Sequence, residues 1–372
     1  MYDFIFNNGN KILSKSTKNL FFIDNYRFKI LGEGSYGIVY KVQYQNKVFV
    51  AKIMKKENDE TKKIEDIRTI INLNKKSIIN LFNEYIVNIN DVFIKKHPNI
   101  IIFEYLEIND IDKYLKIIDI LEEEHFYIII SKLILGISLI HNKIKYSHGD
   151  IKPLNILYDP INFKLKIIDF GFACKLNDYT CNNKYKGTGN YIHPGMNNIM
   201  LNKKNNLFFV KTKKKIKKNL KKSTRIKNKN KKIIPKPISQ DFFSLIITIF
   251  KIYQYLEIEN NKDEQNLSIY ITKYFSYNIK KNLYKYKKRL NKKKIFFKNL
   301  NKININEISN PVMKSLLYSI KNFWDYESYN FIKKEDKSKY ILMKLLDISI
   351  KNIKNSKIKK KLLKDKKIIF KK

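Results

Sequence analysis

The chain has 372 residues, enough for a two-lobed enzyme or for two small domains. Its apolar content of 44% and its aromatic content of 13% exclude a wholly disordered chain. The formal net charge of +42 favours acidic partners, nucleic acid or anionic membrane surfaces, although Lys, Asn and Ile are abundant throughout, and the bias of an AT-rich genome explains the charge more simply.

The cellular location is predicted from what the sequence lacks. The longest apolar stretch, Phe126 to Ile140, is interrupted by polar residues, so we expect a buried helix and no membrane span. Residues 1–10 show no secretory signal, and Cys174 and Cys181 are expected to be free thiols. These observations predict a soluble, intracellular protein of the cytoplasm (the host cytoplasm if the chain is viral), with the nucleus left open.

The first third of the chain predicts a β-rich N-terminal lobe over residues 25–105 that contains one helix. Residues 1–24 give few structural signals and are interpreted as a leader. Apolar residues around a Gly-rich turn between Arg27 and Phe49 indicate three strands. The stretch from Glu57 to Leu73 carries apolar residues at helical spacing, and residues 85–103 indicate two further strands.

The remaining chain predicts a mainly helical C-terminal lobe over residues 106–350. A long buried helix is expected from Phe126 to Ile140. No acid occurs from Tyr179 through Gln240, and a disordered Lys-rich insertion is expected at about 197–238. Order is expected to resume at Asp241. Further helices are expected at 311–324 and 340–350, and residues 351–372 form a basic C-terminal tail.

A Gly-rich segment contains Gly32, Gly34 and Gly37 between two apolar stretches. Glycines let a hairpin lie close over phosphates with its backbone N–H groups facing the anion. A dinucleotide-binding loop or an ordinary hairpin would show a similar spacing, but a dinucleotide loop opens a helix. Because Val39 to Val42 continues as a strand, a hairpin that covers phosphates is favoured.

Lys52 lies in an apolar strand, where an ammonium group needs a partner if it is buried. A phosphate and a carboxylate would satisfy it, whereas an exposed lysine would need neither. Glu65, on the following helix, is the candidate carboxylate, with Glu60 and Glu57 as alternatives.

The segment from His148 to Asn155 is followed by Asp169-Phe170-Gly171, with a short hairpin between them. Asp150 can accept a hydroxyl proton, and Lys152 can neutralise charge on a phosphoryl group in transfer. Asn155 and Asp169 offer the oxygen ligands that Mg²⁺ prefers. These residues could also be unrelated surface residues, but the complete spacing makes chance assembly improbable.

These motifs resemble those of the eukaryotic-type protein kinases from about Phe28 to Ile350, most closely up to Thr188. The resemblance implies an α+β, bilobal fold and ATP and Mg as cofactors. It makes Asp150 the catalytic base, with Lys152 beside it, and assigns Asn155 and Asp169 to the metal. It implies that the nucleotide site contains Gly32, Gly34, Gly37, Val39, Val50, Lys52, Glu65, Phe103 as gatekeeper, Glu104 to Leu106 as hinge, and Leu157.

Two further segments extend the resemblance into the C-terminal lobe. Lys152-Pro153 matches the Ser/Thr pattern, and Thr188 lies in a segment similar to the floor under the acceptor residue. Asp241 resembles the buried acid that binds the catalytic-loop backbone. The chain is therefore interpreted as a Ser/Thr protein kinase, and its composition and His-Gly-Asp sequence suggest a member from a large DNA virus.

Two departures from the family pattern affect the activation loop and the lower lobe. Gly149 replaces the usual arginine that grips a phosphorylated activation loop, which implies an enzyme that needs no such phosphorylation. His193-Pro194-Gly195 stands where the family has Ala-Pro-Glu, and no matching arginine is found in the last helices. The ion pair that normally braces the lower lobe is therefore expected to be lost.

Several functions and partners stay open. A pseudokinase scaffold would lack Lys52, Asp150 or Asp169, and all three are present. A basic protein that binds nucleic acid through the Lys-rich insertion and the tail is a further alternative, although a solvated loop is the simpler interpretation. Protein substrates are expected, with acidic ones favoured by the acid-free stretch. The sequence gives no oligomeric state.

Overall fold

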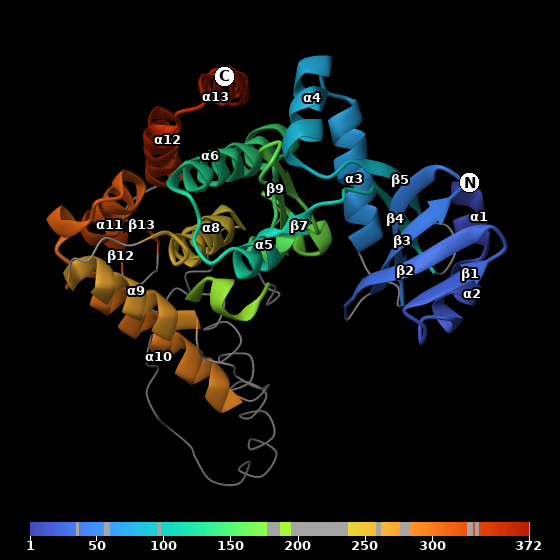
Figure 1. Ribbon diagram of the computed structural model, residues 1–372, viewed down its shortest axis with the longest axis horizontal. Coiled ribbons are helices and arrows are strands. Elements are labelled where there is room, and N and C mark those ends of the chain that lie inside the picture. Colours follow the sequence, from blue (N-terminus) through green and yellow to red (C-terminus); the bar gives the residue numbers. More distant parts are fainter. Residues whose placement is uncertain are drawn as a thin grey trace, which may run out of the picture.

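The computed structural model describes residues 1–34, 37–55, 60–94, 98–176, 187–194, 237–257, 262–275, 283–325, 330–331 and 335–371. A sheet-rich lobe lies on one side and a helical lobe on the other (Figure 1). The predicted α+β, bilobal fold is confirmed. The Lys-rich insertion falls almost entirely outside the described residues.

The smaller lobe is built on one antiparallel sheet with the strand order β1-β2-β3-β4-β6-β5. Its strands are β1 Leu20–Ile23, β2 Tyr26–Glu33, β3 Gly37–Tyr44, β4 Lys47–Met54, β5 Ile89–Phe93 and β6 Ile100–Glu104. Alternate side chains such as Phe28, Tyr40 and Phe49 are buried on one face and form the core of this lobe. The strands expected from the sequence are confirmed.

The first 24 residues are more structured than the sequence signals suggested. They form α1 (Tyr2–Asn7), α2 (Gly9–Ser14) and β1. Ile5 and Ile12, seven positions apart, are fully buried in the core of the smaller lobe, and Phe4 stacks on Tyr26 with ring centroids 4.1 Å apart. The interpretation as a leader is therefore corrected, because these helices cover one face of the sheet.

The N-terminal lobe also contains more helix than the single one expected. After α3 (Glu60–Asn72), the chain forms α4 (Lys76–Tyr85) and then enters β5. Apolar side chains of α4, including Leu81, Phe82 and Tyr85, are buried where the helix packs against α6 and β10. The helix α4 thus connects the smaller lobe to the centre of the larger one.

The larger lobe surrounds α6 (Glu123–Leu139), in which every residue from Phe126 to Leu139 is buried. A helix that is apolar on all sides belongs in the core of a large lobe. Residues 123–144 are long and apolar enough to cross a membrane, but 83% of an apolar 18-residue window within them is buried inside the protein. The predicted buried helix is confirmed.

Helices and short strands complete the larger lobe. Among the described residues, the remaining α-helices are α5 Ile111–Ile117, α8 Pro237–Tyr253, α9 Lys262–Phe275, α10 Leu283–Leu300, α11 Pro311–Phe323, α12 Glu335–Asn352 and α13 Ser356–Phe370. The strands are β7 Asn109–Asp110, β8 Tyr146–Ser147, β9 Ile156–Asp159, β10 Lys164–Ile167, β11 Cys174–Lys175, β12 Trp324–Asp325 and β13 Asn330–Phe331. The helix α8 begins at Pro237, four residues before the expected start at Asp241, since proline suits the first turn of a helix.

The basic C-terminal segment is a helix packed on the larger lobe, which corrects the interpretation of residues 351–372 as a separate tail. Leu362, Asp365 and Ile369 of α13 are buried at helical spacing against α6 and its continuation. The hydroxyl of Tyr85 on α4 donates to Asp365 Oδ2 at 2.6 Å. Figure 1 places α13 and α4 at the same edge of the molecule.

Cys174 is disulfide-bonded in the structure, so the expectation of two free thiols is wrong. A count of two cysteines excludes a framework of several bridges but cannot tell whether their sulfur atoms meet. Cys181 lies outside the described residues.

Candidate active site

Two loops that carry the predicted chemistry are fixed side by side by short strand pairs. The strands β9 and β10 pair antiparallel between the loops, and β8 pairs with β11 at their outer ends. The first loop, residues 148–155, carries Asp150 and Asn155, while the second begins at Asp169. The backbone N–H of Ile168 donates to the carbonyl of Asn155 at 3.0 Å, so Asp169 directly adjoins the first loop.

The ammonium group of Lys52 on β4 lies between two carboxylates. It donates to Asp169 Oδ1 at 3.1 Å and forms an ion pair with Glu60. Burial alone would lower the pKa of Lys52, but the charges of Asp169 and Glu60 raise this pKa overall. For Asp169, burial opposes ionisation, yet the charge of Lys52 holds the pKa below its usual value. Lys52 therefore stays charged and is available to an anion.

The carboxylate partner of Lys52 is Glu60, which corrects the choice of Glu65. Glu60 shares the buried face of α3 with Ile64 and Ile67, at positions i, i+4 and i+7. Glu65 is turned away from this face and pairs with Arg68 at 3.5 Å. The spacing of the apolar residues in the sequence already placed Glu60, and not Glu65, on the same helix face as Ile64 and Ile67. The other alternative, Glu57, lies outside the described residues.

The glycine hairpin and the expected adenine pocket adjoin Lys52. The N–H of Gly34 donates to the carbonyl of Gly37 at 2.9 Å, which closes the turn between β2 and β3. A Cβ on Gly32 would meet no atom within 4 Å, whereas one on Gly37 would lie 2.7 Å from the carbonyl oxygen of Ile53. Gly37 is therefore required by the close packing of β3 on β4, while Gly32 faces open space.

The apolar candidates for the adenine pocket lie on adjacent strands and are half-buried. Val39 pairs with Lys52, Val50 pairs with Phe103, and Leu157 lies on β9. Their partial exposure suits a pocket wall better than a closed core.

Glu104 ends β6, and Leu106 follows it as a half-buried residue. The side chain of Glu104 accepts from Lys166 at 2.6 Å and from the N–H of Asn88 at 2.8 Å. These contacts fix the start of the expected hinge.

Asp150, Lys152 and Thr188 form a closed set of contacts. The ammonium group of Lys152 lies 2.7 Å from Asp150 Oδ2 and 2.6 Å from Thr188 Oγ1. The Thr188 hydroxyl donates to the same oxygen of Asp150 at 3.1 Å. Asp150 is 1% exposed, and its other oxygen, Oδ1, has no hydrogen-bond partner among the described residues. A buried acceptor without a donor is suited to receive a hydroxyl group.

Buried polar side chains hold the first loop in shape. Asp241 on α8 accepts from the backbone N–H groups of His148 and Gly149, both at 2.7 Å, and contacts His141 Nε2 at 2.8 Å. The ring of His148 contacts the carbonyl of Ile168 at 2.9 Å. The structure thus brings Asp241 to the loop backbone, and His148 joins the two loops in a way that the sequence did not indicate.

The donor set fits a metal that also binds phosphate oxygens. Asn155 Nδ2 donates to Asp150 O at 2.8 Å and to Asp150 Oδ2 at 3.2 Å, which leaves the amide oxygen as the possible ligand. Asp169 supplies carboxylate oxygens. The described residues hold no cluster of three or more His, Cys, Asp or Glu side chains that could bind a metal by themselves. Two protein oxygens suit Mg²⁺, which keeps water and phosphate ligands.

The comparisons agree with this geometry. The protein kinase domain family matches residues 26–256, more than half of the chain, so this chain belongs to the protein kinase family. The chain is 30% identical over 167 residues to the serine/threonine-protein kinase dst1 of Dictyostelium discoideum, covering 44% of this chain and 22% of that protein. The resemblance to eukaryotic-type Ser/Thr protein kinases is thus confirmed.

Other relatives are similarly distant. The chain is 26% identical over 186 residues to the mitogen-activated protein kinase kinase SIPKK of Nicotiana tabacum, covering 49% of this chain and 50% of that protein. It is 32% identical over 153 residues to the cyclin-dependent kinase 1 of Encephalitozoon cuniculi, covering 38% of this chain and 48% of that protein. The matches span half or less of the length of these relatives.

Proposed function

We propose that this chain is an ATP-dependent Ser/Thr protein kinase that transfers the γ-phosphoryl group of ATP, with Mg²⁺, to a protein hydroxyl. The observation that carries the proposal is the single site around Lys52 and Asp150. Lys52 contacts Glu60 and Asp169, and Asp169 follows the residue that is hydrogen-bonded to the Asp150–Asn155 loop. Such a site can bind phosphates and accept a proton at neighbouring positions.

The chain's own side chains take distinct roles in this proposal. Lys52 offers its ammonium group to the nucleotide phosphates, and Glu60 holds that group in place. Asn155 and Asp169 would hold Mg²⁺, which neutralises phosphate charge when bound. Asp150 Oδ1 accepts a hydrogen bond from the hydroxyl group of the protein substrate and then takes its proton. Lys152 keeps Asp150 Oδ2 occupied and adds positive charge next to the acceptor.

Gly149 supports the further proposal that no phosphorylation of the activation loop is needed. Its φ is +82°, and a Cβ at this position would lie 2.4 Å from the carbonyl oxygen of Phe172. The arginine that would bind a phosphorylated loop therefore cannot stand here without a backbone shift. Phosphatase-treated protein is expected to keep its activity, and inactivation by phosphatase would contradict this.

The function is tested with Asp150→Asn in the full chain. Phosphate transfer from labelled ATP to a mixed acidic and basic protein panel should fall roughly 10²- to 10⁴-fold, because the base is removed. Asp159→Asn is the matched control, since Asp159 ends β9 and its hydrogen bonds among the described residues are with Ile161 and Asn162 of the following turn. Circular dichroism should be the same for the three proteins, and each should unfold in one cooperative transition above the assay temperature.

A scaffold without catalysis would give a different result. In that case nucleotide binding would be measurable while the unmodified chain transferred no phosphate to any protein of the panel. Equal rates for Asp150→Asn and the unmodified chain would also reject the proposed role of Asp150.

For the acceptor, we propose acidic segments, because the ammonium of Lys152 is next to Thr188 and no acid occurs from Tyr179 to Gln240. A peptide array should show a preference for acidic residues near the acceptor, and a preference for Arg-rich peptides would contradict it.

Contact with nucleic acid through the insertion is tested by deleting residues 200–236 and measuring both activity and salt-sensitive DNA binding.

A further inference from the structure

Buried side chains from three helices hold the backbone just after Thr188. The carbonyl groups of three successive residues each accept a hydrogen bond from a side chain of a different helix. Asn190 O accepts from Tyr274 Oη at 2.6 Å, Tyr191 O accepts from Ser244 Oγ at 2.7 Å, and Ile192 O accepts from Lys293 Nζ. Gln240 Oε1 also accepts from the N–H of His193 at 2.7 Å. The backbone is therefore held at four successive residues, from Asn190 to His193.

Lys293 is the least expected member of this set. It lies on α10, is 1% exposed, and its ammonium group also approaches Gly189 O at 3.5 Å and the ring of Phe243 at 5.4 Å. An ammonium group is rarely buried unless it is paired, and a lysine has three donors to share among acceptors. Here carbonyl groups of the segment 189–192 serve as those acceptors.

This location coincides with the loss of a family feature. His193-Pro194-Gly195 replaces Ala-Pro-Glu, so the usual glutamate of the bracing ion pair is missing from this sequence. A cation that binds backbone carbonyls needs no glutamate. The lysine can thus act where a guanidinium–carboxylate pair cannot form.

We propose that Lys293 is a positioning residue for the acceptor platform, residues 188–193, and that it replaces the missing ion pair. The inference rests on the proposed function, since the platform is where a protein acceptor would lie. Thr188 at its start contacts both Lys152 and Asp150. A shift of the following backbone therefore displaces the acceptor while leaving the contacts of Lys52 unchanged.

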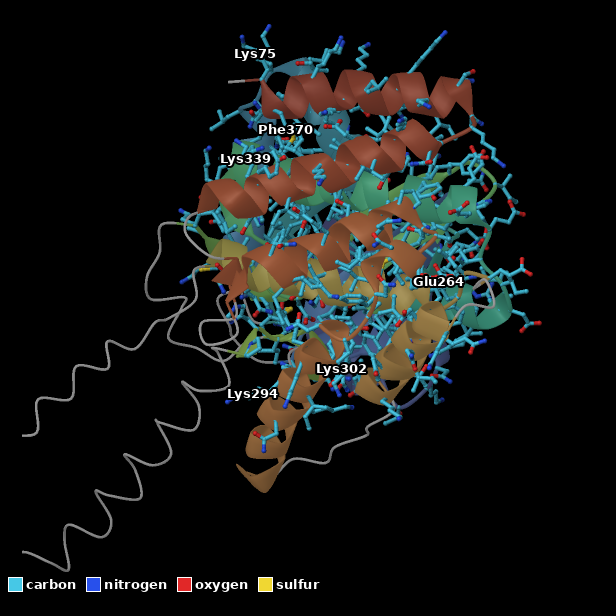
Figure 2. The ribbon with its side chains drawn as sticks, turned by 90° about the vertical axis from the view of Figure 1, so that its left-hand side faces the viewer. Lys75, Glu264, Lys294, Lys302, Lys339 and Phe370 are labelled. Atoms are coloured by element: carbon cyan, nitrogen blue, oxygen red, sulfur yellow. The ribbon has the colours of Figure 1, made fainter. Side chains whose placement is uncertain are left out.

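The test compares Lys293→Met with Lys294→Met in the full chain. Methionine keeps the length of the side chain and removes the charge. Lys294 is the matched control because it is the next residue on α10 and is exposed; its side chain is labelled in Figure 2. For Lys293→Met, the KM of a protein acceptor should rise about tenfold, as expected for a lost hydrogen bond to a charged group. The KM of ATP should stay unchanged, and Lys294→Met should leave both unchanged.

Amide hydrogen exchange gives a second measurement that needs no activity. Exchange at residues 187–194 should be about tenfold faster in Lys293→Met than in the unmodified chain, and unchanged in Lys294→Met. If the unmodified chain transfers no phosphate, the proposed function fails, while this comparison still decides the role of Lys293.

Tyr274→Phe covers the case in which Lys293→Met does not fold. This substitution removes the hydroxyl group that donates to Asn190 O of the platform. The KM of the acceptor should rise about threefold, and the KM of ATP should stay unchanged. The proposal is overturned if the folded Lys293→Met protein keeps its acceptor KM and its exchange rates. It is equally overturned if Lys293→Met is unfolded and Tyr274→Phe changes neither quantity.

Discussion

Glu60 and Glu65 lie five positions apart on α3, and this separation places them on different faces of the helix with different partners. Glu60 lies on the buried face of α3 and reaches Lys52, whereas Glu65 lies near the surface and pairs with Arg68. Burial raises the pKa of Glu60, even though the charge of Lys52 acts in the opposite direction. The ion pair therefore fixes the position of the lysine more than it adds stability, because both charges lose water.

The pair Glu60→Gln and Glu65→Gln tests this difference in role. The value of kcat/KM for ATP should fall about 10- to 100-fold in Glu60→Gln, since a charged partner of Lys52 is lost. It should change less than about twofold in Glu65→Gln, as is usual for surface substitutions. Steady-state rates at several ATP concentrations check both values. A larger loss for Glu65→Gln would restore the assignment made from the sequence.

Gly149 is a residue whose backbone conformation and close contact with Phe172 oppose a side chain. Gly149→Ala should lower the free energy of unfolding by about 1–3 kcal/mol, because the positive φ and the contact with Phe172 O both oppose a Cβ. Gly32→Ala is the control, since its Cβ would meet no atom within 4 Å, and it should lower this free energy by less than about 1 kcal/mol. Urea unfolding measures both changes. Equal stabilities would show that the loop can relax around a side chain.

At the scale of elements, α13 connects the larger lobe to α4. Glu84 on α4 pairs with Lys132 of α6 and with Lys361 of α13, both at 2.7 Å. Burial acts to raise the pKa of Glu84, but the charge of Lys132 and the two lysine contacts lower it overall. Tyr85 and Asp365 add a hydrogen bond beside this cluster. The Lys-rich end of the chain is therefore part of the fold.

Leu362 and Leu363, adjacent on α13, test whether this helix stabilises the lobe. Leu362 is fully buried, and Leu362→Ala should lower the free energy of unfolding by about 2–5 kcal/mol. Leu363 is 41% exposed, and Leu363→Ala should change this free energy by less than about 0.5 kcal/mol. Chemical denaturation of the full chain measures both. Equal effects would mean that α13 does not pack on α6 in solution.

At the scale of the whole molecule, the dominant quantity is the net charge of +42. Charge of one sign repels itself and opposes the compact state, and salt screens this repulsion. The Tm should therefore rise when NaCl is raised from about 10 mM to about 200 mM, because the Debye length falls from about 30 Å to less than about 8 Å. Thermal unfolding at constant pH measures the shift, and KCl at equal ionic strength should give the same Tm. A fall in Tm would show that the ion pairs outweigh the repulsion.

Features that depend on contiguous residues could be predicted from the sequence. The glycine turn, the strand with Lys52 and the Asp150–Asn155 loop each lie within one short segment, where spacing alone indicates the local structure. The long helix around Phe126 to Leu139 was equally clear, because a helix that is apolar on all sides must be buried.

The sequence by itself therefore determined the two lobes and the kinase family, and it supplied most residues of the proposed site. Only the tertiary structure decided that Glu60 faces Lys52, that the basic end of the chain forms a docked helix, and that one lysine within Lys292-Lys293-Lys294 enters the core. The physical reason is that the burial of a charge depends on the partners that the fold brings to it from distant segments. The carbonyl groups that bind Lys293 lie about a hundred residues away in the chain, and no local pattern indicates them.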